Sequence, residues 1–381
     1  MKLSMRMPIR SSLLTFAVFL NCGIRSRTIN SAAAFTSTSS SDSPSFTTAK
    51  TSHQQRPGVS TTCDIRRSSS FAMNPSSSSS SSSAKTFMDT LNEAVSSSLG
   101  RKVDLQSTSG GGASGGGGAT TGAVLDALTN TKYFLKSARG SLDMLRAEYE
   151  GVKAMADTKT IQVPTPVAFG VHEPTNQGFC VFEYLEFCGG GNQYDLGVKL
   201  AQMSRHTSPD GKFGFVIDNT IGATPQPNTP WMDDWADFWD EHRLGHMLKL
   251  TGNAGLAKDK VEKLRTKTRE LLSHKPPASI VHGDLWGGNK GFCKKDGNVI
   301  PVIFDPATYY GDREVDVAMT YVFGGFNGDF YDGYNSEYPL PPGWEKRKTV
   351  YNLYHILNHD VLFGGGYLRQ AQGMIDQILR M

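Results

Sequence analysis

The chain has 381 residues, and its formal net charge of +3 is unevenly distributed. Ten of its 39 basic residues but only two of its 36 acidic residues lie in residues 1–85, so the remaining 29 and 34 give the body a net charge of about −5. That balance argues against nucleic-acid binding by the body, and five cysteines without metal-ligand spacing exclude a disulfide framework.

Residues 1–85 have the composition of a targeting leader. They include the serine run Ser76–Ser83 and have too few apolar residues to offset the entropy of ordering the chain. A basic start precedes an apolar run, Leu13–Leu20, which is too short to span a bilayer but suits the core of a signal peptide. With the small residues and Phe of Ser31–Phe35, the leader resembles the two-part presequences of algae with complex plastids. We therefore predict a disordered leader that directs the protein to a plastid, the alternatives being a mitochondrial leader or a disordered tail on a cytoplasmic protein.

Residues 86–187 carry the pattern of a small, strand-rich lobe. Apolar residues recur every four positions after Phe87, which predicts a short helix that ends near Gly100. Pro164 and Pro166 are expected to end the region of the helix at Ser141–Ala156. The elements expected here are a glycine-rich stretch, two strands, a helix and a third strand, at Gly110–Gly118, Thr120–Leu128, Tyr133–Leu135, Ser141–Ala156 and Gly178–Tyr184.

Residues 188–381 are predicted to be mostly helical. A hinge is expected at the three glycines of Gly189–Gly191, and helical patterns dominate after it. One β-hairpin interrupts them between Lys290 and Phe304, with an Asp-Gly-Asn turn at residues 296–298. The order of elements predicts an α+β fold with two lobes: a β-rich N-lobe, residues 86–187 with the glycine-rich loop, and a mostly α-helical C-lobe, residues 188–381. A binding cleft is expected between the lobes.

The segment Ile280–Asn289 has the pattern of a phosphoryl-transfer loop. Two apolar residues of strand type precede Asp284, and Asn289 lies five positions later. Phosphoryl transfer needs a carboxylate to accept the proton of the attacking hydroxyl, and oxygen ligands for Mg²⁺. The same spacing occurs in the kinase catalytic loop, which predicts Asp284 as the catalytic base and Asn289 as a Mg²⁺ ligand. A surface turn is the alternative, but it does not explain the His and Trp that flank the acid.

Asp305 follows an apolar run, Val299–Phe304, that is typical of a buried strand. A carboxylate directly at the end of such a strand is costly unless it is paired or bound to a metal. Asp305 therefore fits a second Mg²⁺ ligand, in the place of the aspartate of the kinase DFG motif. A cap at the end of the strand is the alternative.

Two features of the N-lobe are candidates for ATP binding. Lys136 ends a strand and Glu148 lies twelve residues on, within a helix whose neighbouring positions are apolar. In a kinase lobe such a lysine contacts the α- and β-phosphates and the helix glutamate holds it, whereas solvated flanks would explain either residue alone. The glycines Gly116, Gly117 and Gly118 could cradle phosphates through their backbone N–H groups, although they form no Walker loop and a linker is the alternative.

Tryptophans occur in two settings. Trp231, Trp235 and Trp239 recur every four residues, which predicts one face of a helix packed in the core. Trp286 instead lies within the predicted catalytic loop, where an aromatic wall for a sugar ring is plausible. The cysteines of the body are expected to be ordinary reduced thiols, at Cys180, Cys188 and Cys293.

From Gly116 to Met381 the chain resembles the fructosamine kinase / ketosamine-3-kinase family, within the protein-kinase-like superfamily. Trp directly after Asp-Leu in the catalytic loop separates this family from aminoglycoside and choline kinases, which share the broader loop. The segments that carry the resemblance include His282-Gly-Asp-Leu-Trp-Gly-Gly-Asn289, Phe304-Asp-Pro-Ala-Thr-Tyr-Tyr-Gly311, Glu314-Val-Asp-Val-Ala318, Phe323-Gly-Gly-Phe326, Lys212-Phe-Gly-Phe215, Leu357-Asn-His359 and Gly365-Gly-Tyr367.

The resemblance implies a bilobal protein-kinase-like fold and ATP-dependent phosphorylation of the sugar 3-hydroxyl of a ketosamine. The substrates would be glycated proteins or free ketosamines, and phosphorylation would promote deglycation. The resemblance also implies that the adenine bonds to the backbone of the hinge, at Glu183, Tyr184 and Leu185, and that Trp286 lines the sugar pocket. Neither a nucleic-acid partner nor a membrane is expected for the mature form, and the oligomeric state is left open.

The chain departs from the family in two places. Met203-Ser204 replaces a Leu-His pair that members often have, and Ala119 stands in the glycine loop where some members carry a redox-active cysteine. Redox regulation is therefore not carried over. Two other functions remain open: a kinase of another small hydroxyl or amino-sugar substrate, similar to aminoglycoside or choline kinases, and a non-catalytic kinase-like binding module.

Overall fold

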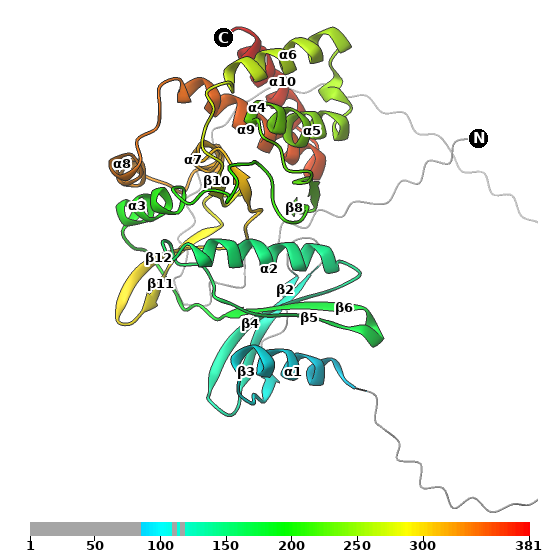
Figure 1. The fold of residues 1–381 in the computed structure, drawn as a ribbon, viewed down its shortest axis with the longest axis vertical. Coiled ribbons are helices and arrows are strands. Elements are labelled where there is room, and N and C mark those ends of the chain that lie inside the picture. The colour runs from blue at the N-terminus through cyan, green and yellow to red at the C-terminus, as the bar shows by residue number, and fades with distance from the viewer. Residues whose placement is uncertain (1–84, 109–112, 115–118) are drawn as a thin grey trace, which may run out of the picture. The chain divides into compact units, whose positions relative to one another are not determined.

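The computed structural model describes residues 85–108, 113–114 and 119–381. All but the last residue of the predicted leader, and the three candidate phosphate-binding glycines at 116–118, lie outside the described residues. The chain from residue 85 onward forms a sheet-rich part followed by a helical part, which confirms the predicted bilobal α+β class (Figure 1). None of the helices described is both long and apolar enough to cross a membrane.

The sheet-rich part is built on one antiparallel sheet. Its strand order is β1-β3-β4-β6-β5, and the short strand β2 pairs with β3. The register places Lys136 between Thr121 on β3 and Cys180 on β6. The strands are β1 (Leu105–Ser107), β2 (Ala113–Ser114), β3 (Thr120–Asp126), β4 (Thr131–Arg139), β5 (Pro166–His172) and β6 (Gln177–Glu183).

Two helices cover the two faces of this sheet (Figure 1). Helix α1 (Phe87–Leu99) begins at a capping box formed by Thr86 and Asp89 and ends at Gly100 in the left-handed region. It buries its apolar stripe against one face of the sheet. Helix α2 (Leu142–Asp157) packs Leu145 and its neighbours against the opposite face, where Lys136 points.

The helical part contains most of the remaining chain. Its largest core cluster joins buried aromatic side chains of α4, α9 and the π-helical turn Trp239–Leu244. Its helices are α3 (Gln193–Met203), α4 (Trp235–Phe238), α5 (Gly245–Leu250), α6 (Lys258–Leu271), α7 (Glu314–Phe323), α8 (Gly328–Glu337), α9 (Trp344–Phe363) and α10 (Tyr367–Leu379). Short 3₁₀ turns lie at Glu173–Thr175 and Asn253–Gly255.

The helical part also contains seven short strands, and four of them position the loop that carries Asp284 and the segment that carries Asp305. Strands β10 (Ser279–Val281) and β13 (Tyr309–Gly311) pair antiparallel, so the loop after β10 and the segment before β13 lie side by side. The hairpin β11 (Lys290–Lys295) and β12 (Asn298–Ile303) connects them, and β7 (Phe187–Cys188) pairs with β11. A separate hairpin is formed by β8 (Asn219–Ile221) and β9 (Thr224–Gln226).

Several sequence predictions are confirmed and others need correction. The helix after Phe87, the helix after Ser141 and the hairpin around residues 296–298 are present. Strands β1 and β2 were not predicted, because they are short. The prediction of one hairpin in residues 188–381 is also wrong, since β8 and β9 form a second one whose strands have only three residues each. Strand β5 was also missed: Pro166, expected to end regular structure, is its first residue, which is tolerated because β5 lies at the sheet edge.

The prediction that three tryptophans share one helix face is wrong for Trp231. Asp234 is the N-cap, since its side chain accepts a hydrogen bond from the N–H of Asp237, so the helix begins only at Trp235. Trp231 lies before that start, with its ring 5.9 Å from the ring of Tyr310. Trp235 and Trp239 are buried in the core, as predicted.

Candidate active site

Lys136 and Glu148 form an ion pair between the sheet and helix α2. Strand β4 directs the lysine towards α2, and its Nζ lies 2.6 Å from Oε2 of Glu148. The two side chains are only 11% and 13% exposed. Burial alone would lower the pKa of Lys136, but the negative charges of Glu148 and Asp305 raise it above its ordinary value. The lysine is therefore a fixed cation that faces the end of strand β12.

The loop after β10 brings the predicted base and the predicted amide ligand together. The Nδ2 of Asn289 donates to the backbone oxygen of Asp284 at 2.9 Å and to that of Asp305 at 3.2 Å. Because the amide nitrogen of Asn289 faces those two segments, its Oδ1 points away from them. Among the described residues, this oxygen accepts no hydrogen bond. Asn289 therefore links both loops and keeps one oxygen open as a ligand.

Asp284 is a partly buried carboxyl at the centre of this loop. Burial, together with the neighbouring charge of Asp305, raises its pKa to about 7. A carboxyl that titrates near neutrality is matched to accepting a proton under physiological conditions. The side chain of Asn289 approaches its Oδ2 at 3.3 Å, which keeps the carboxyl oriented.

Asp305 lies two positions after strand β12, which is buried in its second half and not throughout as predicted. The residue has an unusual backbone conformation. Its φ is +54°, in the left-handed region that a residue with a side chain adopts at a cost. Its side chain is 53% exposed, and one carboxylate oxygen lies 3.8 Å from Nζ of Lys136. The carboxylate and the open oxygen of Asn289 are hard oxygen donors of the kind that Mg²⁺ prefers.

The role of Asp316 in supporting the loop was missed at the sequence level. This buried aspartate on α7 accepts hydrogen bonds from the backbone N–H groups of His282 at 2.7 Å and Gly283 at 2.8 Å. His282 in turn donates through Nε2 to the carbonyl of Phe304 at 2.9 Å, and burial lowers its pKa to about 4, so it stays neutral. The loop is thus fixed to α7 on one side and to the end of β12 on the other.

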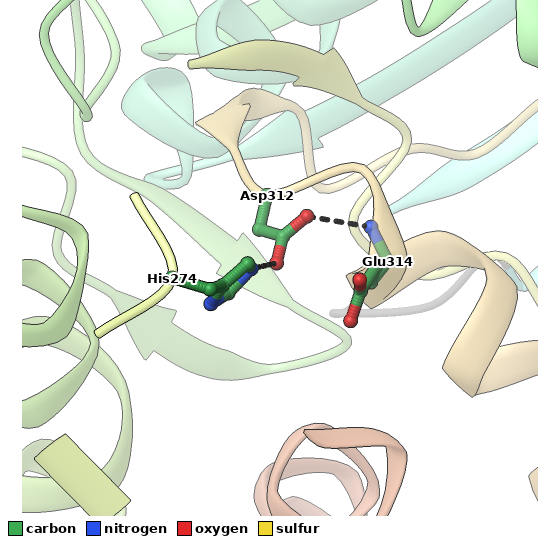
Figure 2. A group of neighbouring side chains, drawn as sticks. All are labelled: His274, Asp312 and Glu314. Carbon is green, nitrogen blue, oxygen red and sulfur yellow. Dashed lines mark hydrogen bonds and ion pairs between the residues drawn. The ribbon is translucent and has the colours of Figure 1, made fainter. Parts of the chain in front are cut away.

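A group of charged side chains supports the start of α7 (Figure 2). Asp312 accepts a hydrogen bond from the N–H of Glu314 at 3.0 Å and one from Nε2 of His274 at 2.8 Å. The carboxylate of Glu314 is already held by Arg347, whose two nitrogens lie 2.6 and 2.8 Å from its oxygens. Three of these side chains are close enough to surround a metal ion, but the guanidinium neutralises the glutamate. We assign the group to holding α7, and hence Asp316, in place.

The predicted adenine-binding hinge, Glu183–Leu185, contains backbone groups that are already hydrogen-bonded and others that are not. The N–H of Glu183 donates to the carbonyl of Thr165 at 2.8 Å, and its carboxylate is bound by Thr165 and Lys295. Tyr184 lies beneath the ammonium of Lys132. The N–H of Leu185, by contrast, has no hydrogen-bond acceptor among the described residues. Leu185 therefore offers a backbone donor to a ligand at the hinge.

Trp286 belongs to a larger aromatic surface than the sequence suggested. Its ring lies 6.2 Å from that of Phe323 at the end of α7, and Phe323 lies 4.5 Å from the ring of His359 on α9. His359 donates through Nδ1 to the carbonyl of His355, and burial lowers its pKa. Both Phe323 and His359 lie in segments that carry the family resemblance, but no role had been predicted for either.

The structure thus brings Lys136, Glu148, Asp284, Asn289 and Asp305 into one hydrogen-bonded and charged set. Trp286 flanks that set, and the hinge contributes Leu185 as a donor while the side chain of Glu183 is engaged elsewhere. The candidate glycines at 116–118 cannot be placed in the set, because they lie outside the described residues.

Known proteins are similar to this chain in both sequence and fold. The family model described as fructosamine kinase matches residues 88–381. A probable ketoamine kinase of Synechocystis is 50% identical over 256 residues, which cover 66% of this chain and 84% of that protein. A chloroplastic protein-ribulosamine 3-kinase of Oryza sativa is 42% identical over 258 residues, 66% of this chain and 73% of that protein. The crystal structure of a Haemophilus somnus protein assigned as a fructosamine-3-kinase matches with a TM-score of 0.64 and 28% identity, over 76% of this chain and 97% of that one.

Proposed function

This chain belongs to the fructosamine kinase family, and from that premise we propose that it transfers the γ-phosphate of ATP to the sugar 3-hydroxyl of a ketosamine. The observation that carries the proposal is Asp284: its pKa of about 7 suits a general base, and Asn289 holds it beside Asp305. A kinase-like binding module without activity would have no need for this complete set of charged residues.

The N-lobe residues are proposed to bind ATP. The cation of Lys136, held by Glu148, suits the α- and β-phosphates. The free N–H of Leu185 suits a ring nitrogen of the adenine, and the backbone carbonyl of Glu183 suits its amino group. Tyr184 between them contributes backbone to the same hinge. The glycines at 116–118 are proposed to cover the phosphates through their N–H groups.

Asn289 and Asp305 are proposed to hold Mg²⁺. Their free oxygens fit the ion, because one amide and one carboxylate oxygen lie on segments that the amide nitrogen of Asn289 ties together. When bound, the ion supplies neutralisation of the phosphate charge. Lys136, 3.8 Å from Asp305, adds a second positive charge to the same region.

Asp284 is proposed to accept the proton of the sugar 3-hydroxyl while that oxygen forms a bond to the γ-phosphorus. The bond between the γ-phosphorus and the oxygen bridging it to the β-phosphate breaks, and ADP leaves with the electron pair. Trp286, with Phe323 behind it, is proposed to form the apolar wall against which the sugar ring lies. Phosphorylation next to the ketosamine carbon makes the adduct prone to leave the amine, so the reaction promotes deglycation.

Glycated proteins or free ketosamines are the proposed acceptors, in keeping with the names of the relatives. The test is a panel in which ADP release is followed with ribulosyl-lysine, fructosyl-lysine, choline and an aminoglycoside as acceptors. We expect turnover with a ketosamine and none with the last two compounds. Turnover with choline or the aminoglycoside alone would support kinase activity but contradict the proposal that the acceptor is a ketosamine.

The leader and the lobe boundaries remain proposals. Rice and Arabidopsis relatives are named chloroplastic, and we propose that residues 1–85 direct this chain to a plastid, with lobes at residues 86–187 and 188–381. A fluorescent protein fused behind residues 1–85 tests the address. Fluorescence within plastids is expected, whereas mitochondrial or cytoplasmic fluorescence would contradict it.

A further inference from the structure

We propose that the hairpin β8–β9 sets the affinity of the site for Mg²⁺, because two of its carboxamides, those of Asn219 and Gln226, hold the backbone that carries Asp305. This inference rests on the proposed function, in which Asp305 is a Mg²⁺ ligand. Neither residue touches ATP or the acceptor in the proposed arrangement, so both are positioning residues.

The backbone after Asp305 is held by hydrogen bonds from two sides. On one side the N–H of Ala307 donates to the carbonyl of His282 in the catalytic loop, at 2.8 Å. On the other side the Nε2 of Gln226 donates to the carbonyl of Ala307 at 3.1 Å, and the Nδ2 of Asn219 donates to the carbonyl of Thr308 at 2.8 Å. The two residues are neighbours across the hairpin, so one short element supplies both donors.

The surrounding groups determine which way each carboxamide faces. The Oε1 of Gln226 accepts a hydrogen bond from the hydroxyl of Tyr354 at 2.7 Å, which leaves its nitrogen for Ala307. The Oδ1 of Asn219 accepts from Gln226 at 2.8 Å and from Asn228 at 3.0 Å, which leaves its nitrogen for Thr308. Gln226 is fully buried and Asn219 nearly so, and a buried donor or acceptor without a partner is costly. The network therefore favours one arrangement of the segment.

Asp305 depends on this external support. It has a positive φ of 54°, which costs free energy for a residue with a side chain. Its side chain is more than half exposed, and the ion-pair distance of 3.8 Å to Lys136 is too long for a hydrogen bond. Little in the side chain therefore fixes its place. The backbone held by Asn289 on one side of Asp305 and by the hairpin carboxamides on the other does so instead.

The test uses the full chain and an isosteric change, Gln226→Glu, which sets a carboxylate oxygen against the carbonyl of Ala307. The control is Gln372→Glu on α10, a partly buried position where the amide also donates to a backbone carbonyl, that of Ala254 at 2.9 Å, outside the site. Calorimetry with a non-hydrolysable ATP analogue gives the apparent Kd for Mg²⁺ and the Kd of the nucleotide without Mg²⁺. We expect the Mg²⁺ Kd of Gln226→Glu to rise roughly tenfold, with the metal-free nucleotide Kd unchanged and the control equal to wild type.

A second variant covers the case in which Gln226→Glu fails to fold. Tyr354→Phe removes only the hydroxyl that orients Gln226, and we expect the Mg²⁺ Kd to rise by about two- to fivefold. A lowered Tm with an unchanged Mg²⁺ Kd in the folded variants would show a merely structural role for the hairpin. That result would overturn this inference and leave the proposed function standing. If the wild-type chain shows no Mg²⁺-dependent nucleotide binding, the inference and the proposed function both fall.

Discussion

Removing the charge of Glu148 is the perturbation whose effect the structure bounds best. In Glu148→Gln the shape of the side chain is kept, but the charged partner 2.6 Å from Lys136 is lost. Hydrogen bonds to charged groups contribute about 1.5–3 kcal/mol, which corresponds to roughly 10- to 150-fold in kcat/KM for ATP. We expect the lower half of that range, because Asp305 at 3.8 Å remains as an alternative partner for the lysine.

The same helix offers a matched control. Lys153 and Asp157 also form an ion pair on α2, at 3.1 Å, but their side chains are 53% and 67% exposed. Exposed pairs contribute little, so Asp157→Asn should leave kcat/KM within about twofold of wild type. Initial rates of ADP release at varied ATP concentration give the comparison. If Glu148→Gln behaves like Asp157→Asn, the ion pair does not position the lysine for ATP and the reasoning is refuted.

Three further predictions follow from the catalytic loop. Asp316→Asn replaces one of two acceptors for buried N–H groups, and we expect kcat to fall roughly 10- to 100-fold; a change below twofold in the initial rate would contradict that role. Because the pKa of Asp284 is raised to about 7, its proton is retained as the pH falls below that value, so kcat/KM should fall from pH 8 to pH 6, and a flat profile would contradict the assignment. Because that pKa lies above the ordinary value of 3.8, this carboxyl lowers the stability of the folded chain as the pH rises from about 4 to about 7, and the full loss is present above pH 7. Asp284→Asn should therefore raise the Tm by more at pH 8 than at pH 5, as measured by thermal unfolding.

Local spacing was enough to single out the side chains that the structure brings together in the candidate site. Asp284 and Asn289 share one loop, and Asp305 follows the next apolar run, Val299–Phe304, so each could be identified from its neighbours in the sequence. Lys136 and Glu148 were recognised because a strand and the helix after it have a known order in kinase lobes. Their contact at 2.6 Å agrees with that expectation.

Side chains that hold the site by binding backbone groups cannot be recognised from local spacing in the sequence. Asp316 binds two N–H groups of the catalytic loop from a helix more than thirty positions away. Gln226 and Asn219 bind carbonyls about eighty to ninety positions away. Backbone N–H and C=O groups are present at nearly every residue, so the partner cannot be read from the sequence. Only the fold shows which side chain meets which segment.

The elements that were missed have a similar explanation. Strand β5 begins with Pro166, which normally argues against a strand, and only its place at the sheet edge makes the residue acceptable. Trp231 fits the four-residue spacing of Trp235 and Trp239, but the cap at Asp234 starts the helix after it. In both cases a local rule was overridden by the position of the residue in the fold.

The central claim is that this chain phosphorylates a ketosamine with Asp284 as the base. The most direct measurement is the mass of ribulosyl-lysine after incubation with the full chain, ATP and Mg²⁺, beside the variant Asp284→Asn. We predict a product heavier by one phosphate with the wild-type chain, and a loss of that product in the variant. An unchanged mass with the wild-type chain, under conditions in which ATP is shown to bind, would contradict the claim.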